Sequence, residues 1–214
     1  MLVVPPIPPA TPLAPVGISS SSPSTLLAPA QTGLSMSSAQ LNVLEGSNAT
    51  FTGTLTGPRR SALSRRVVVL QGLGRRGWHT LERARTNAKG RFQFTYAARQ
   101  LGSELMRVRF NGDAFDLASH RRIGVFNVYR LAGASWYGGG GGLACGGTLT
   151  SSTIGVANKT LPCGTLVTLR YGSHTVRVPV VDRGPYVAGR EFDLTEATKQ
   201  ALGFGDTGQV WSTR

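Results

Sequence analysis

The sequence predicts an all-β protein, on three observations. Glycine is abundant, at 28 of 214 residues, and only 15% of the residues are charged. Short runs of alternating apolar and polar residues recur between turn residues, about every 8 to 12 residues. Only one stretch, residues 195–202, has a helical pattern, and Gly203 follows it. Such chains fold as sandwiches or barrels, and this length accommodates one large or two ordinary domains.

Residues 1–35 are expected to be a linker or the remnant of an export segment, without a fold of their own. They hold most of the 12 prolines and the serine run Ser19–Ser22, a composition typical of extended linkers. Met1–Ile7 has no basic residue, and prolines interrupt it, so it is not a normal signal peptide. Either the start is displaced, or export does not use that route. No run reaches the roughly 18 apolar residues of a transmembrane segment.

Residues 36–130 are expected to form a β-sandwich of about seven strands. Phe92, Phe94 and Tyr96 fall on one face of their strand, which favours core packing over a binding stripe. The expected strands are 40–43, 49–55, 66–71, 78–81, 91–96, 105–110 and 123–129.

Three motifs in this half resemble immunoglobulin-like modules of secreted actinobacterial proteins. They are Trp78 in its strand, Lys89–Phe92 and Arg107–Asp113. The resemblance implies an immunoglobulin-like sandwich. Because sandwiches of this kind host many roles, it says little about function, and a spacer or a wall-binding module is the default expectation.

The positive charge is concentrated in the first half. Residues 36–130 carry 16 Lys and Arg against 5 Asp and Glu, a net charge of +11, whereas residues 131–214 carry 7 against 5, a net +2. A basic surface attracts polyanions, so we expect residues 59–122 to attract anionic wall polymers. A phospholipid surface or merely solvated arginines are the alternatives. Nucleic acid is disfavoured because no aromatic and arginine motif for it is present.

The two cysteines, Cys145 and Cys163, are expected to form a disulfide. With His174 they offer only three ligands, too few for a structural zinc site. Their separation suits a disulfide loop, which implies an oxidising compartment. No metal or other cofactor is expected.

In residues 131–214 the lead catalytic candidate is Asp182. It ends the apolar strand 175–181 and precedes the turn Gly184–Pro185. A rigid strand followed by a turn places such a side chain at a rim, where a substrate reaches it. The alternative is that Asp182 only hydrogen-bonds its own turn. The five glycines 138–142 do not form a phosphate loop, because no Lys-Ser/Thr follows them.

Residues 131–214 contain four collinear motifs: Ala134–Gly138, Ala157–Thr165, Asp182–Tyr186 and Arg190–Thr195. Together they resemble the rare lipoprotein A (RlpA) family, whose members act on peptidoglycan glycan strands. The resemblance implies a six-stranded double-psi β-barrel with a short helix over residues 131–214, distantly related to expansins.

The family pattern has three catalytic polar positions, and this sequence retains one of them. The family Asp falls on Asp182, whereas the family His falls on Asn158 and the family Glu on Gly147. The family Asn and aromatic positions are Cys145 and Cys163 here, which supports their pairing.

One acid can nevertheless suffice. A lytic transglycosylase closes the sugar's own 6-hydroxyl onto the anomeric carbon, so a single group can give one proton and take another. The related membrane-bound transglycosylase A family works in this way.

Other residues are given supporting roles. Substrate contacts are expected from Asn158, Tyr186, Arg183, Trp136 and Tyr137. In the alternative interpretation Trp136 and Tyr137 are core residues. Arg183 points away from Asp182 along an extended strand and towards Asp193, which is expected to be a structural hydrogen-bonding residue near the helix.

Two functions fit these residues. The first is a secreted or envelope-associated endolytic transglycosylase that uses Asp182. The second is an expansin-like module that grips glycan without cutting it, which the missing His and Glu favour.

Overall fold

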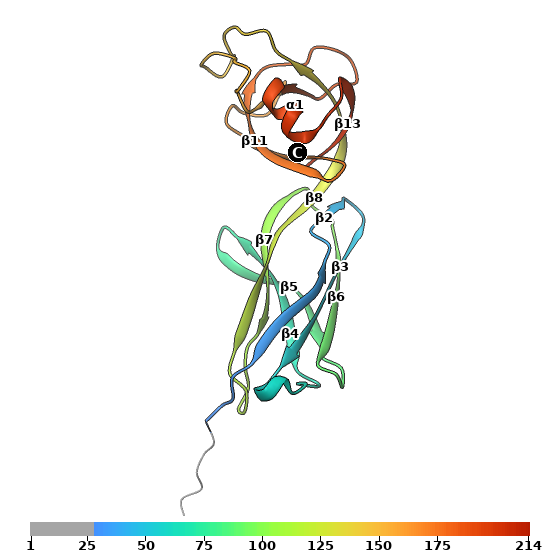
Figure 1. Ribbon diagram of the computed structural model, residues 1–214, viewed down its shortest axis with the longest axis vertical. Helices are drawn as coiled ribbons and strands as arrows, with labels where there is room; N and C mark the ends of the chain where they lie inside the picture. The colour runs from blue at the N-terminus through green and yellow to red at the C-terminus, as the bar shows by residue number, and fades with distance from the viewer. Residues whose placement is uncertain (1–27) are drawn as a thin grey trace, which may run out of the picture.

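The computed structural model describes residues 28–214, which form two β-structures stacked along the long axis of the molecule (Figure 1). The linker predicted for residues 1–27 lies outside the described residues. The all-β prediction with one short helix is confirmed. The described elements are β1 (Gly33–Ala39), β2 (Asn42–Leu44), β3 (Asn48–Thr56), the 3-10 turn η1 (Pro58–Arg60), β4 (Val67–Gly74), β5 (Gly77–Arg85), β6 (Arg91–Ala97), β7 (Gly102–Phe110), β8 (Ser119–Tyr137), β9 (Val156–Ala157), β10 (Leu166–Tyr171), β11 (His174–Asp182), β12 (Phe192–Thr195), α1 (Glu196–Leu202) and β13 (Thr207–Ser212).

Two sheets make up the first half. One has the order β1-β3-β6, and the other has the order β5-β4-β7-β8 with β2 added along β8. One apolar core contains residues of both sheets, among them Phe51 and Phe94 of the first and Leu70 and Met106 of the second. Phe92 and Phe94 are almost fully buried and Tyr96 packs against them, so the predicted core role is confirmed. The narrower immunoglobulin-like assignment stays a prediction.

The strand β1 was not expected, and it begins at Gly33, within the range 1–35 for which no fold was predicted. Ala30 also forms a β-bridge with Asp116. The segment Gly33–Ala39 reads GLSMSSA, whose small residues favour strands only weakly, and a register shift between Met36 and Ser38 interrupts its period. The ordered fold therefore starts before residue 36.

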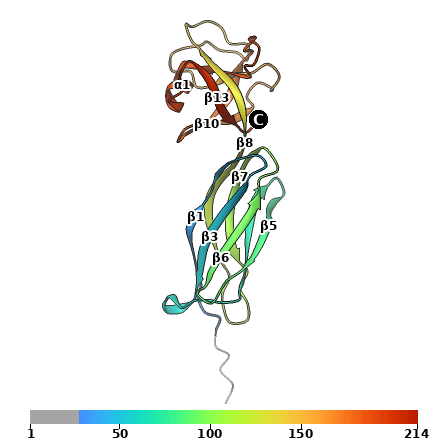
Figure 2. The same cartoon turned by 90° about the vertical axis from the view of Figure 1, so that its right-hand side faces the viewer.

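The long strand β8 belongs to both halves (Figure 1 and Figure 2). Residues 119–128 pair with β7, and residues 130–137 pair with β13 and β12. A polar network crosses the junction, in which the Ser103 hydroxyl donates to Asn127 Oδ1 at 2.7 Å and lies 3.1 Å from Thr168 Oγ1. The predicted boundary between residues 130 and 131 thus falls inside one continuous strand.

The second half is a closed ring of six strands in the order β8-β12-β9-β11-β10-β13. Its core contains Val178, Val180, Phe192 and Leu194, because β11 and β12 alternate buried and less buried residues. Helix α1 packs on β11 and β12 and ends at Gly203, whose φ of 63° suits glycine. The ring agrees with the predicted double-psi barrel. No helix within residues 28–214 is long and apolar enough to cross a membrane.

Candidate functional site

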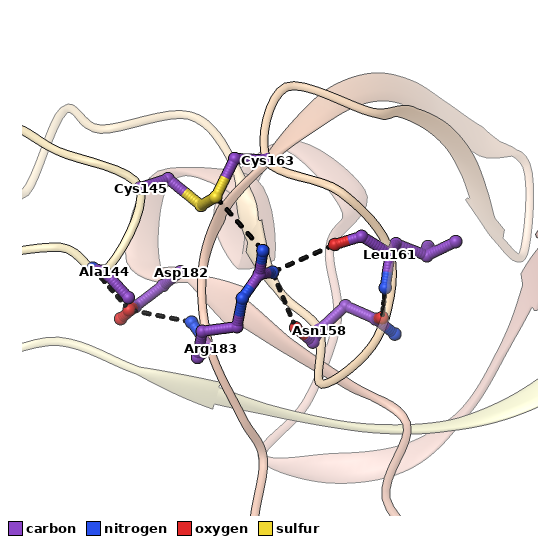
Figure 3. The surroundings of a disulfide bond; sticks show 7 residues. All are labelled: Ala144, Cys145, Asn158, Leu161, Cys163, Asp182 and Arg183. Carbon is purple, nitrogen blue, oxygen red and sulfur yellow. Dashed lines mark hydrogen bonds between the residues drawn. A yellow bond between two sulfur atoms is a disulfide. The ribbon is translucent and has the colours of Figure 1, made fainter.

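Asp182 ends β11 beside Ala157 of β9 and is half-buried. Its Oδ1 accepts hydrogen bonds from two main-chain N–H groups, that of Ala144 at 2.9 Å and that of Arg183 at 2.8 Å (Figure 3). The bond from Arg183 is the turn contact expected of a structural Asp. Within residues 28–214, Oδ2 accepts no hydrogen bond. One carboxylate oxygen is therefore fixed, and the other is available.

Asp193 lies on β12, and strand β9 separates it from Asp182 at the end of β11. Ala157 is paired with both residues, which places them two strand spacings apart, or about 10 Å between backbones. The Ser135 hydroxyl of β8 donates to Asp193 Oδ1 at 2.6 Å. Asp193 is thus held within the sheet, and Thr195 is the residue that precedes α1 as its N-cap.

Tyr137 brings a neutral phenol to these carboxylates. Its hydroxyl oxygen is buried and has no hydrogen-bond partner within residues 28–214. Burial raises the pKa of Tyr137, and the Asp182 carboxylate raises it further, through its negative charge and because it lies within hydrogen-bonding reach of the hydroxyl; the charge of Asp193 acts in the same direction. A buried donor without a partner costs about 1–3 kcal/mol, so this hydroxyl is available to a ligand atom or a carboxylate.

Arg183 and Asn158 brace the loop that follows β9. The Arg183 Nη1 donates to the carbonyls of Asn158 and Leu161, at 3.1 and 2.9 Å (Figure 3). Asn158 Oδ1 accepts from the amides of Thr160 and Leu161, and its Nδ2 donates to the Glu191 carbonyl. The guanidinium therefore turns to the loop and not to Asp193 as expected. Asn158 is only 8% exposed, which leaves at most one amide N–H for a sugar.

Cys145 and Cys163 form a disulfide, as predicted, with an S–S distance of 2.01 Å and a Cα–Cα distance of 5.6 Å. It ties the loop that carries Ala144 to the loop that Arg183 braces, and Arg183 Nη2 lies 3.2 Å from Cys163 Sγ (Figure 3). The disulfide and the guanidinium therefore hold together both loops around Asp182.

The two expected aromatic partners, Trp136 and Tyr137, lie on opposite sides of β8. Trp136 Nε1 donates to Asp206 Oδ1 at 2.9 Å, and Lys199 Nζ sits 3.9 Å from the ring centroid. Trp136 is thus directed to α1, away from Asp182, and one ring face is covered. Tyr186, in the turn after Asp182, is 81% exposed. Of the expected sugar-stacking residues, Tyr186 is the most accessible.

Comparison with known families identifies this half of the chain. Residues 131–211 match a family model described as "Lytic transglycolase". This segment is an RlpA-like double-psi β-barrel domain. Two of the elements that frame its site end in these motifs: β8 ends at Tyr137 of the SWYG segment, and β11 ends at Asp182, the first residue of the DRGP segment.

Curated relatives match the same region. The probable endolytic peptidoglycan transglycosylase RlpA of Aquifex aeolicus is 43% identical over 75 residues, 33% of this chain and 33% of that protein. The protein of that name in Synechocystis is 38% identical over 99 residues, 41% and 30% of the two chains. The endolytic peptidoglycan transglycosylase RlpA of Pseudomonas aeruginosa UCBPP-PA14 is 38% identical over 87 residues, 38% and 26%. The chain thus spans about a third or less of each relative.

Among solved structures, domains 5–6 of the S-layer protein SbsC align over 84% of this chain and 94% of theirs, at 15% identity. The TM-score is 0.30, which does not indicate a shared fold.

The RlpA-like barrel departs from the family pattern on the side of Asp182 that faces the glycine-rich loop. Gly147, the position at which the resemblance implied a family Glu, has a φ of 85° in an exposed loop. A side chain other than glycine is strained in this conformation. The local backbone therefore favours glycine at this position.

Sequence reasoning missed two groups of the site, the Ala144 amide and the Ser135 hydroxyl. A main-chain donor leaves no trace in residue type, because any residue except proline supplies it. Ser135 could have been found, since it precedes Tyr137 by two residues in a strand and so shares its face.

Proposed function

We propose that the RlpA-like barrel is an endolytic lytic transglycosylase that cuts peptidoglycan glycan strands with Asp182 as its single acid and base. The observation that carries the proposal is the Asp182 carboxylate at the end of a barrel strand, with one oxygen fixed by two amides and the other without a main-chain donor within residues 28–214. The names of the curated relatives support the substrate class.

The chemistry balances with one titrating group. Protonated Asp182 gives its proton to the glycosidic oxygen as the bond from that oxygen to the anomeric carbon breaks. The sugar's 6-hydroxyl oxygen then bonds to the same carbon, and the Asp182 carboxylate takes the hydroxyl proton. The products are a shortened strand with a free hydroxyl and a 1,6-anhydro sugar end, and no water is consumed.

The surroundings of Asp182 suit this role. Both amide donors bind Oδ1, so they orient the carboxyl group and leave Oδ2 to exchange protons. The Tyr137 hydroxyl is a further neutral donor beside it. Tyr186, highly exposed in the adjacent turn, provides a surface on which a pyranose ring can stack.

A second candidate is a non-catalytic, expansin-like module that grips the glycan. The glycine at position 147 and the amide at position 158 favour it, because neither can exchange a proton. Ordinary hydrolysis needs two carboxyl groups, and the second carboxylate, Asp193, is occupied by Ser135.

One experiment separates the two candidates. The purified chain and its Asp182→Asn variant are incubated with denuded glycan strands, and the products are analysed by mass for anhydro ends. Asp113→Asn, the same change in the β7–β8 loop of the other half, is the matched control. We expect anhydro products from the wild type and the control and none from Asp182→Asn. Glycan binding without products from any of the three would contradict the enzyme and support the gripping module.

The proposal includes the location and a second partner. A disulfide is typical of proteins outside the cytoplasm, and peptidoglycan lies there, so we assign the chain to the cell envelope or the exterior. The basic residues within 59–122 are proposed to attract anionic wall polymers and so concentrate the enzyme at its substrate.

A further inference from the structure

Five arginines lie on the outer face of the sheet β5-β4-β7-β8, the side away from the apolar core. Arg83 and Arg109 flank Val69 on its two neighbouring strands, and Arg107 is paired with Arg122. Their neighbours along each strand, such as Val108, point into the core. The arginine face consists of Arg83, Arg85, Arg107, Arg109 and Arg122.

Within residues 28–214, none of these five arginines forms an ion pair. Three of the nearby acidic residues are engaged elsewhere, since Asp113 and Asp116 bind Arg66 and Glu104 binds His79. Glu82, next to Arg83 in β5, is paired with the core residue Leu70 and so belongs to the other side of the sheet. Burial lowers the pKa of Arg107, and the charges of Arg109 and Arg122 lower it further. The face is therefore a concentration of like charge without internal compensation.

Side chains on this face are packed on the sheet. Val69 lies between Arg83 and Arg109 of the neighbouring strands and is only 3% exposed, although it points outward. Arg107 lies over the Trp78 ring, 4.1 Å from its centroid, and its Nε donates to Gln71 Oε1 at 2.8 Å. Packing and hydrogen bonds thus hold guanidinium groups in place before any ligand binds.

We propose that the arginine face is the binding site for a linear wall polymer of the phosphodiester type, such as poly(glycerol phosphate). This rests on the proposed function, which places the chain in the cell envelope. Three strand spacings separate β5 from β8, about 14 Å, and residues two apart on one strand are about 7 Å apart. Such a patch spans several charges of one polymer. Guanidinium groups suit phosphate because they donate two parallel hydrogen bonds to it.

Nucleic acid fits the face less well. Single strands bind by stacking their bases on exposed aromatic rings. Trp78 is the one aromatic residue on this face among the described strands, and Arg107 covers its ring. A polymer without bases does not need an exposed aromatic ring, so the covered Trp78 ring does not weaken its binding.

The test is binding of the whole chain to immobilised poly(glycerol phosphate) over a range of salt concentrations. Arg83→Gln with Arg122→Gln removes two exposed charges from the outer strands of the face. The matched control, Arg75→Gln with Arg76→Gln, removes two exposed charges from the β4–β5 turn. We expect the face pair to weaken binding about 10- to 30-fold and to lower the slope of log K against log salt by about 1.4. The control should change affinity less than about twofold.

Several outcomes would overturn the proposal. Equal losses of affinity in the face pair and the control pair would mean that the net charge of the chain attracts the polymer without a specific site. Tighter binding to single-stranded DNA with the same number of phosphates would mean a nucleic-acid site, and no binding to the polymer would end the proposal outright. Melting temperatures of all variants exclude misfolding, since glutamine keeps part of each stem. Cleavage of polymer-free glycan by the face pair should equal that of wild type. Binding of the polymer without any cleavage of glycan would overturn only the proposed transglycosylase activity.

Discussion

Replacing Cys145 and Cys163 together by serine is expected to lower the free energy of unfolding by about 3 kcal/mol. The two residues are 18 positions apart, and the chain-entropy model gives this value for a loop of that length in the unfolded chain. For a chain of this size the corresponding fall in melting temperature is about 6–12 °C. The folded state loses little by comparison, because both side chains lie near the surface.

The same change should also reduce cleavage. Cys145 follows Ala144, whose amide binds Asp182, and Cys163 lies beside the Arg183 guanidinium. Without the covalent tie, the Ala144 loop can move away from Asp182, and a displacement of about 1 Å at a reacting group can cost on the order of 100-fold in rate.

Urea unfolding and anhydro-product formation measure the two effects. The wild type treated with a reductant is the control, and it should match the double variant in both. A stability loss below about 1 kcal/mol would refute the unfolded-state reasoning. Unchanged cleavage by a destabilised variant would refute the link between the disulfide and Asp182.

Three further changes test other parts of the structure. Tyr137→Phe removes a buried hydroxyl without a partner, so stability in urea should be unchanged or higher by up to about 1 kcal/mol, whereas cleavage should fall if the hydroxyl serves Asp182. Asn127→Ala removes the side chain that accepts from Ser103 and donates to Asn42 beside the junction of the halves, and it should cost about 1–3 kcal/mol in one cooperative transition; two separate transitions would contradict the coupling through β8. Hydrogen bonds from Lys199 and Trp136 lower the pKa of Asp206, so their stabilisation is complete above the unfolded pKa of about 3.9 and is lost as the pH falls through the folded value. Urea midpoints between pH 2 and 5 should therefore fall less for Asp206→Asn than for wild type.

The sequence predicts those parts of the fold that alternation and turns encode. The strands around Phe94 and Val178 and the helix before Gly203 follow the expected ranges closely. Strand β1 was missed because its small residues favour strands only weakly and a register shift after Met36 interrupts its period. The continuity of β8 was missed because nothing in a local pattern reports which neighbours a strand takes. Pairing partners are tertiary information.

The residues of the candidate site were predictable where a local sequence signal marks them, and not where their role depends on tertiary contacts. Asp182 was found because a strand followed by a turn is a local signal, and the disulfide because cysteine spacing is one. Trp136 and Tyr137 were grouped by adjacency, although neighbours in a strand point to opposite sides. The loop bracing by Arg183 depends on main-chain carbonyls that residue types do not report.

The substitutions around Asp182 form one structural unit. In the family pattern, positions 147 and 158 carry groups that exchange protons; here Gly147 lies in an exposed loop and Asn158 braces a loop with three hydrogen bonds. Both cysteines and Arg183 brace the same two loops. A site that relies on one titrating group gains most from holding that group rigidly, because geometry then supplies part of the barrier reduction that further acids and bases would supply. The proposed single-acid mechanism therefore depends on the rigidity that the disulfide and Arg183 give to these two loops.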